Sequence, residues 1–134
     1  MISTLLVRRS IVALLFTVLL AVASFGQSTS GSITGTVVDN TGATIADANV
    51  TVVNAATSLA RTIKTNSSGV FVAPQLPPGR YDITVEKNGF KKLVKTEIIL
   101  SAIEQLNAGS FTLEVGQVSE SVTVTADADR KSVV

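Results

Sequence analysis

The side chains that usually perform catalysis are scarce in this sequence. None of its 134 residues is a histidine or a cysteine. A zinc hydrolase needs histidine and carboxylate ligands around an open metal position, and a serine hydrolase needs a base beside its nucleophile. The ten Asp and Glu residues stand singly, and no lysine forms a recognisable Ser-Lys pair. We therefore predict that the protein is not an enzyme and uses no metal or cofactor.

The charge distribution argues against nucleic acid as a partner. The first 26 residues, which we interpret below as a cleaved signal peptide, contain two arginines. Without them the chain has nine Lys and Arg and ten Asp and Glu, a net charge of −1. Nucleic acid binding rests on clustered positive charge. The one basic cluster comprises Lys91, Lys92 and Lys95. We interpret it as a solvated strand edge that discourages aggregation between sheets.

Residues 1–26 have the composition of a secretory signal peptide. Two arginines precede an apolar run from Ile11 to Val22, and the small residues Ser24 and Gly26 fit a signal-peptidase site. The apolar run is shorter than the roughly 20 residues that a helix needs to span a bilayer, which argues against a membrane anchor. We predict export with cleavage after Gly26, followed by a small polar lead-in segment, residues 27–31.

The rest of the chain is predicted to be all-β. Tyr81, Ile83 and Val85 alternate with polar residues, as in a strand with one dry and one wet face. Asn66 and Gly69 bracket a turn, and Pro77-Pro78-Gly79 reverses the chain. Seven short strands separated by such turns indicate an antiparallel sandwich or a small barrel. The predicted strands cover residues 32–39, 48–53, 58–65, 70–72, 81–87, 91–100 and 105–115.

The last predicted strand contains an irregularity near Gly109. Leu106 and Ala108 share one alternation parity, whereas Phe111 and Leu113 share the other. One extra residue in a strand produces such a change of parity. We therefore expect a β-bulge or a kink at this glycine.

Five fragments, in their order and spacing, resemble the carboxypeptidase regulatory-like domain. The resemblance covers about residues 32–115 and implies a seven-stranded, antiparallel, transthyretin-like β-sandwich, a fold also grouped with carbohydrate-binding-like folds. One departure is Asn66, where the family often carries Asp in the turn. The fragments are GTVVD (35–39), IADANVTV (45–52), NSSGVF (66–71), LPPGRY (76–81) and GF (89–90).

Residues 116–128 are expected to extend beyond the sandwich, and part of them is similar to the TonB box. That box is the energy-coupling segment ahead of the plug in TonB-dependent outer-membrane receptors. A β-branched, proline-free peptide can add as a strand to an open sheet edge of a periplasmic partner. The other interpretation is that Val122 and Val124 pair within the sandwich as an eighth strand. The residues concerned are Glu120, Ser121, Val122, Thr123, Val124, Thr125 and Ala126.

The position of this segment favours the coupling role. A signal peptide, this domain and then a TonB box is the order found at the start of many such receptors. The resemblance therefore implies a non-catalytic periplasmic extension of a receptor at the outer membrane, with a TonB-type protein and the receptor's own plug and barrel as partners. A 22-stranded barrel needs far more chain than 134 residues, so we expect a fragment of a longer protein. Residues 129–134 break the preceding composition, and we interpret them as a non-native tail.

Two other functions are compatible with the same fold. One is a carbohydrate-binding module, which would need aromatic platforms for sugar rings. At least three of the four aromatic residues after the signal peptide are expected to point inward, and Phe90, after the Asn88-Gly89 turn, is the one candidate for a glycan contact. The other is a structural or adhesive domain of an exported surface protein, which needs no coupling strand.

Overall fold

The computed structural model describes residues 2–21, 29–117 and 119–126. A helix, α1 (Ile2–Ala21), covers most of the predicted signal peptide. Among the described residues no helix combines the length and the hydropathy needed to cross a membrane. The predicted cleavage site after Gly26 and the predicted tail, residues 129–134, lie outside the described residues.

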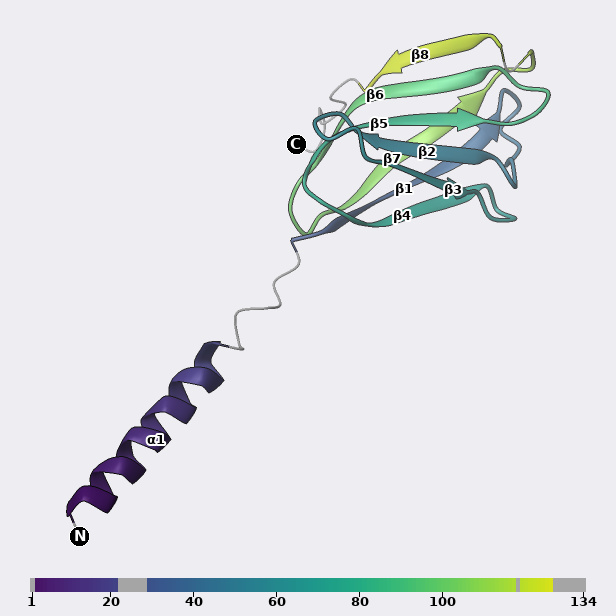
Figure 1. The fold of residues 1–134 in the computed structure, drawn as a ribbon. Coiled ribbons are helices and arrows are strands. Elements are labelled where there is room, and N and C mark those ends of the chain that lie inside the picture. The colour runs from purple at the N-terminus through teal and green to yellow at the C-terminus, as the bar shows by residue number, and fades with distance from the viewer. Residues whose placement is uncertain (1, 22–28, 118, 127–134) are drawn as a thin grey trace, which may run out of the picture.

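In the described part of the chain, eight strands form two sheets that face each other (Figure 1). One sheet has three strands in the order β4-β1-β7, and the other has five in the order β3-β2-β5-β6-β8. The strands are β1 (Gly31–Asp39), β2 (Asn49–Asn54), β3 (Ala60–Lys64), β4 (Val70–Leu76), β5 (Gly79–Glu86), β6 (Lys92–Leu100), β7 (Gln105–Leu113) and β8 (Ser121–Thr125).

The all-β sandwich is confirmed, but the prediction of seven antiparallel strands is wrong in number and in direction. β8 is an additional strand, and it pairs in parallel with β6. β7 also pairs in parallel, with β1. Parallel neighbours cannot be joined by a tight hairpin. The chain instead crosses from one sheet to the other before each of these strands. It passes from β6 in the five-stranded sheet to β7 in the three-stranded sheet, and then back to β8 in the five-stranded sheet.

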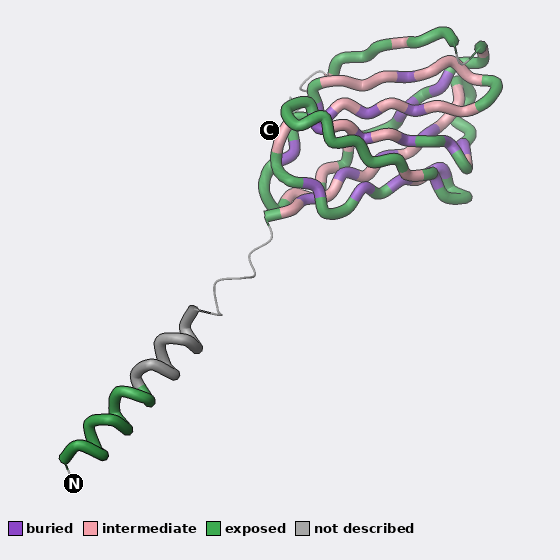
Figure 2. The backbone as a smooth tube through the Cα atoms, viewed as in Figure 1, coloured by how far each residue is buried: buried purple, intermediate pink, exposed green. Residues whose placement is uncertain are grey.

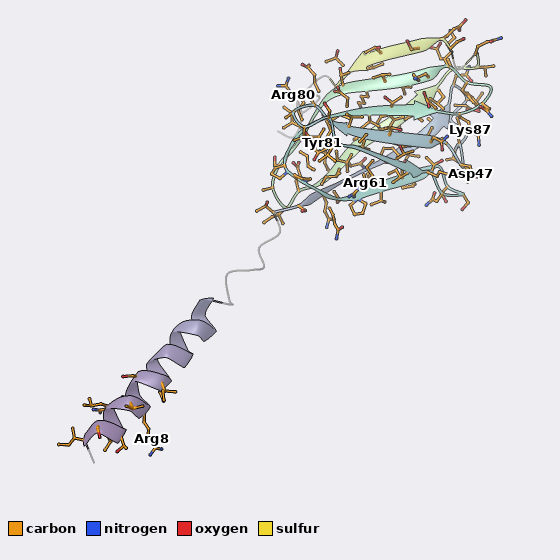
Figure 3. All side chains as sticks on the ribbon, viewed as in Figure 1. Arg8, Asp47, Arg61, Arg80, Tyr81 and Lys87 are labelled. Atoms are coloured by element: carbon orange, nitrogen blue, oxygen red, sulfur yellow. The ribbon has the colours of Figure 1, made fainter. Side chains whose placement is uncertain are left out.

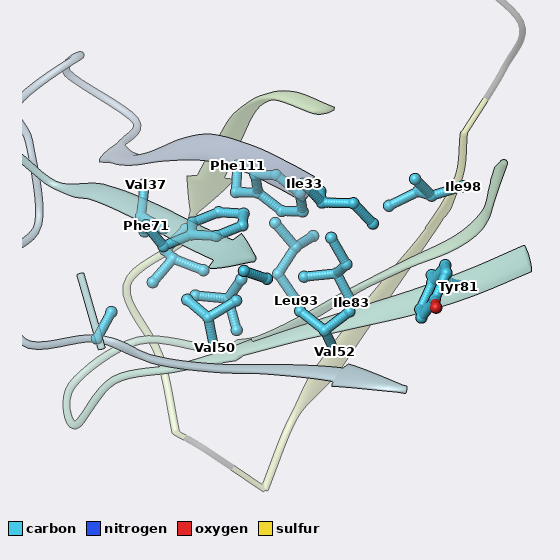
Figure 4. Close-up of a cluster of buried hydrophobic side chains, with 14 of the residues drawn as sticks. Ile33, Val37, Val50, Val52, Phe71, Tyr81, Ile83, Leu93, Ile98 and Phe111 are labelled. Atoms are coloured by element: carbon cyan, nitrogen blue, oxygen red, sulfur yellow. The ribbon is translucent and has the colours of Figure 1, made fainter. Parts of the chain in front are cut away.

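Strict alternation in the central strands builds the core between the sheets. In β1, buried and half-buried residues alternate from Gly31 to Val38, and β5 behaves in the same way from Tyr81. Figure 2 shows this alternation along the backbone, and Figure 4 shows the inward side chains of both sheets meeting. The core takes its buried apolar residues from 33 to 113, and none from α1 or β8 among the described residues.

Two aromatic rings meet over a glycine at the centre of this core. Phe71 on β4 and Phe111 on β7 lie edge to face, with ring centroids 5.4 Å apart and planes at 69°. Both rings lie against Gly35 on β1, the strand between them. A Cβ atom at Gly35 would lie 2.7 Å from the Phe71 ring and 2.9 Å from the Phe111 ring. Only glycine leaves room for both rings.

The predicted turn at Asn66 and the predicted bulge are confirmed. The Asn66 side chain accepts hydrogen bonds from the backbone N–H groups of Ser68 and Val70, at 3.0 and 2.9 Å. In the pairing of β1 with β7, two steps along β1 correspond to three along β7, and Gly109 there has φ +80°. The strand predicted at 70–72 continues to Leu76, because β4 is an edge strand and tolerates Pro74.

A cationic side chain closes each open side of the sandwich. Arg61 on β3 (Figure 3) donates to the carbonyl oxygen of Pro74 on β4, in the opposite sheet. On the other side, Lys95 Nζ on β6 donates to the carbonyl oxygen of Ala108 at the β7 bulge, at 2.7 Å. The same ammonium lies 5.0 Å from the centroid of the Phe111 ring, and its burial lowers the pKa of Lys95.

The interpretation of the basic cluster as a solvated strand edge is therefore wrong for Lys95. β8 covers β6, so β6 is an interior strand of its sheet. Lys95 has the same parity as the buried Leu93 and points between the sheets. An inward-pointing lysine beside a bulge is one of the devices that protect a sheet edge, here the edge of β7.

Gly35→Ala should destabilise the sandwich because the added methyl group would push apart Phe71 and Phe111. Overpacking of a close-packed core lowers the free energy of unfolding by about 1–3 kcal/mol. Urea unfolding at neutral pH measures this loss. Thr112→Ala, on the exposed face of β7, is the matched control and should change stability by less than about 0.5 kcal/mol. Equal stability of the two variants would show that the glycine is not sterically required.

Lys95→Met should lower the free energy of unfolding by about 1 kcal/mol, because the Ala108 carbonyl loses its donor while the apolar stem is retained. Lys92→Met is the control. It removes an ion pair with Glu86 on the outer surface (2.6 Å), and such pairs contribute about 0–1 kcal/mol. A Lys95 variant as stable as the wild-type protein in urea would contradict the closing role of this lysine.

Candidate interaction edge

The residues that resemble a TonB box lie largely in β8, at the rim of the five-stranded sheet. Its register with β6 runs from Ser121 opposite Lys92 to Thr125 opposite Thr96, without a shift. Among the residues that the structure describes, β8 pairs with no strand other than β6. The segment therefore forms the eighth strand, the second of the two interpretations of its sequence.

The hydrogen bonds at the ends of β8 show which main-chain groups remain at the open edge. Glu120 accepts from Lys92 N–H at 2.8 Å, and Ala126 N–H donates to Thr96 at 2.9 Å. Main-chain groups of alternate residues point to opposite sides of a strand. The main-chain N–H and C=O groups of the even-numbered residues of β8 therefore point toward β6. Ser121, Thr123 and Thr125 direct their N–H and C=O groups to the open side.

The side chains of β8 are only shallowly buried. Val122 and Val124 share the inner face with Leu93 and Lys95, their partners on β6. Val122 is half-buried, whereas Val124 remains 45% exposed, since the three-stranded sheet ends at β7. Ser121, Thr123 and Thr125 are exposed on the outer face. The strand thus offers uncharged, β-branched side chains to solvent on both faces.

The segment that leads into β8 is fastened to the turn before β6. Lys91 N–H donates to the Glu114 carbonyl at 2.7 Å, and Gly116 N–H donates to Gly89 at 3.1 Å. The Lys91 ammonium also lies 3.3 Å from the Glu114 carboxylate and 3.6 Å from that of Glu120. These ion pairs lie near the surface and contribute little. They nevertheless place Glu120, the first residue of the TonB-box-like run, beside the start of β6.

The four outer strands differ in how their edges are protected. β3 carries Arg61 and Lys64, β4 contains Pro74, and β7 is interrupted by its bulge. Charges, prolines and bulges are the usual protection against pairing with another strand. From Ser121 to Thr125 there is no charge, no proline and no register shift. Among the outer strands that the structure describes, β8 is therefore the one whose open edge has no such protection.

The aromatic side chains form no exposed platform in the part of the chain that is described. Phe71, Tyr81 and Phe111 are at most 2% exposed, which confirms that three of the four point inward. The hydroxyl of Tyr81 donates to the Pro77 carbonyl at 2.6 Å. Phe90 is half-buried and packs against the core, and its backbone forms an isolated antiparallel β-bridge with Val115. Phe90 as a residue is therefore only partly accessible to a ligand.

A cluster of metal-ligating side chains is also absent from the described ranges. Residues 2–21, 29–117 and 119–126 contain no group of three acidic side chains placed to hold a metal ion. The acidic groups instead support turns and surface pairs. Hydrogen bonds from Thr41 lower the pKa of Asp39, which shapes the turn after β1.

Sequence reasoning did not find two residues that matter at these sheet edges. Lys95 appeared to be one of three equivalent surface lysines, yet it alone points inward and protects β7. Lys91 contacts Glu120 across the chain, which local spacing does not reveal. The single available signal was the parity of Lys95, which matches Leu93 rather than Val94.

The fold is similar to that of several solved structures, which show the fold alone. A chain of the TIE protein of Bacillus anthracis has a TM-score of 0.55 at 18% identity, covering 65% of this chain and 17% of that one. Hydroxyquinol 1,2-dioxygenase from Pseudomonas putida has 0.52 at 11%, covering 69% and 58%. A type II cohesin–X-dockerin complex from Acetivibrio cellulolyticus has 0.50 at 18%, covering 64% and 58%.

This chain thus spans less than two thirds of the length of these similar chains. Among curated proteins, none matches the sequence. A family model does match, over residues 32–126, and so includes β8 as well as the seven strands before it. On this match, the chain belongs to the carboxypeptidase regulatory-like domain family.

Proposed function

We propose that the protein is a non-catalytic binding module, the periplasmic N-terminal extension of a TonB-dependent outer-membrane receptor. In this proposal residues 1–26 direct export and are removed after Gly26. The sandwich is a rigid spacer, and the run from Glu120 to Ala126 is the segment that a TonB-type energy-coupling protein binds. The receptor's plug and barrel would follow in a longer chain.

The observation that carries this proposal is the open, unprotected edge of β8. Strand addition needs free main-chain groups on an extended segment without charge or proline. Ser121, Thr123 and Thr125 provide such groups on one side of β8. The exposed Val124 offers an apolar side chain that a pocket on the partner can read.

A structural or adhesive module is the second candidate. Its support is the closed sandwich itself, whose core excludes β8. Deletion of residues 117–126 would leave such a function intact, whereas a receptor would lose energised uptake. A carbohydrate-binding role has weaker support, because Phe90 is half-buried. Glycan-array binding that disappears in Phe90→Ala would favour that role.

A peptide of residues 120–126 should bind the C-terminal domain of a TonB-type protein with a dissociation constant below about 1 mM. Thr123→Pro and Val122→Pro each remove one N–H, on opposite edges of the extended peptide. At least one of these changes should weaken binding tenfold or more. Isothermal titration calorimetry measures the affinities.

Thr123→Val is the matched control for these peptides, since it keeps both the N–H and the β-branched shape. Its affinity should stay within about threefold of the native peptide, a difference of about 0.6 kcal/mol. A native peptide that does not bind at about 1 mM would refute the coupling role and leave the structural candidate.

A further inference from the structure

The open edge of β8 can also meet an identical edge. An unprotected edge strand is a template for pairing with any compatible strand. In a second copy of this chain, β3, β4 and β7 carry charge, proline or a bulge, so β8 is the compatible strand among those described. Pairing of like with like across a two-fold axis gives a closed dimer rather than a filament.

The hydrogen-bonding pattern fixes one register for this pairing. In an antiparallel pair, directly opposite residues with their groups at the shared edge exchange both hydrogen bonds. The outward groups of β8 belong to Ser121, Thr123 and Thr125. All three are used when Thr123 lies opposite Thr123 of the second copy and Ser121 lies opposite Thr125. A shift by two residues in either direction would lose one of these pairs.

The side chains are compatible with the same register. Val122 of one copy then lies opposite Val124 of the other, on the inner face, where Val124 is exposed in the single chain. Hydroxyl side chains line the outer face, and no like charges meet within the strand. The two rims that extend past β7 would join and shield each other's valines.

We propose that this protein self-associates through antiparallel pairing of β8 with β8 of a second copy, which joins two five-stranded sheets into one of ten strands. The inference does not rest on the proposed function. It places self-association and any strand-adding partner at the same edge, so the two compete. Because the contact spans five residues, it is smaller than a stable dimer interface, and we expect a weak, concentration-dependent dimer.

The test uses residues 27–134, the form left after the predicted cleavage, since no residue of α1 whose burial is described belongs to the core. Sedimentation equilibrium of the wild-type protein should show reversible dimerisation with a midpoint at high micromolar concentration. Thr123→Lys places two ammonium groups opposite each other on the two-fold axis and should raise that midpoint at least tenfold. Thr112→Lys adds the same charge on β7 and should leave the midpoint unchanged. A wild-type protein that stays monomeric up to about 1 mM would overturn the proposal.

Single cysteines test the register, because the chain has no cysteine of its own. Thr123→Cys should form a disulfide-linked dimer under mild oxidation. Ser121→Cys and Thr125→Cys should each form no disulfide-linked dimer alone and should cross-link when mixed. Cross-linking of Ser121→Cys with itself as fast as Thr123→Cys would contradict the pairing. In that case, or if dimerisation persists unchanged in Thr123→Lys, another surface holds the copies together.

Discussion

The position of Gly35 between two phenylalanine rings is the constraint on which the sandwich depends. β1 is the middle strand of the smaller sheet, and its neighbours supply Phe71 and Phe111. The rings can meet edge to face only because β1 has no side chain at that point. Three strands are thereby tied together at one place in a chain without disulfides. The remaining apolar residues pack around this contact.

The unequal width of the two sheets explains both where the sandwich is closed and where it is open. The three strands of the smaller sheet cannot cover the five of the larger one. Arg61 and Lys95 span the two sides at the edges of the smaller sheet. β8 lies at the rim beyond the second of these contacts. Its shallow burial and its availability to another strand have the same cause.

Turns, bulges and side-chain alternation depend on short stretches of sequence and could be predicted. Features that depend on which strands become neighbours in a sheet could not. The Asn66 turn and the bulge at Gly109 follow from residue type and parity, and both were confirmed. The alternation also gave the inward aromatic residues. β7 pairs in parallel with β1, and β8 with β6. Both pairings depend on how the chain crosses between the sheets, which no local pattern records. The inward lysine was missed because its partners, the Ala108 carbonyl and the Phe111 ring, belong to a strand of the opposite sheet.

The nature of the two contacts that close the sandwich has a consequence in acid. In both, a cationic side chain donates to a backbone carbonyl, not to a carboxylate. A carbonyl has no proton to gain, so acidification removes neither contact. The turn after β1 differs, since Asp39 is held there as an anion by hydrogen bonds from Thr41 and Ala43. Its pKa lies below the ordinary 3.8, so this turn loses its support only as the pH falls through that lowered pKa. Acid would therefore loosen this turn, at one tip of the sandwich, while the two contacts along its long sides remain.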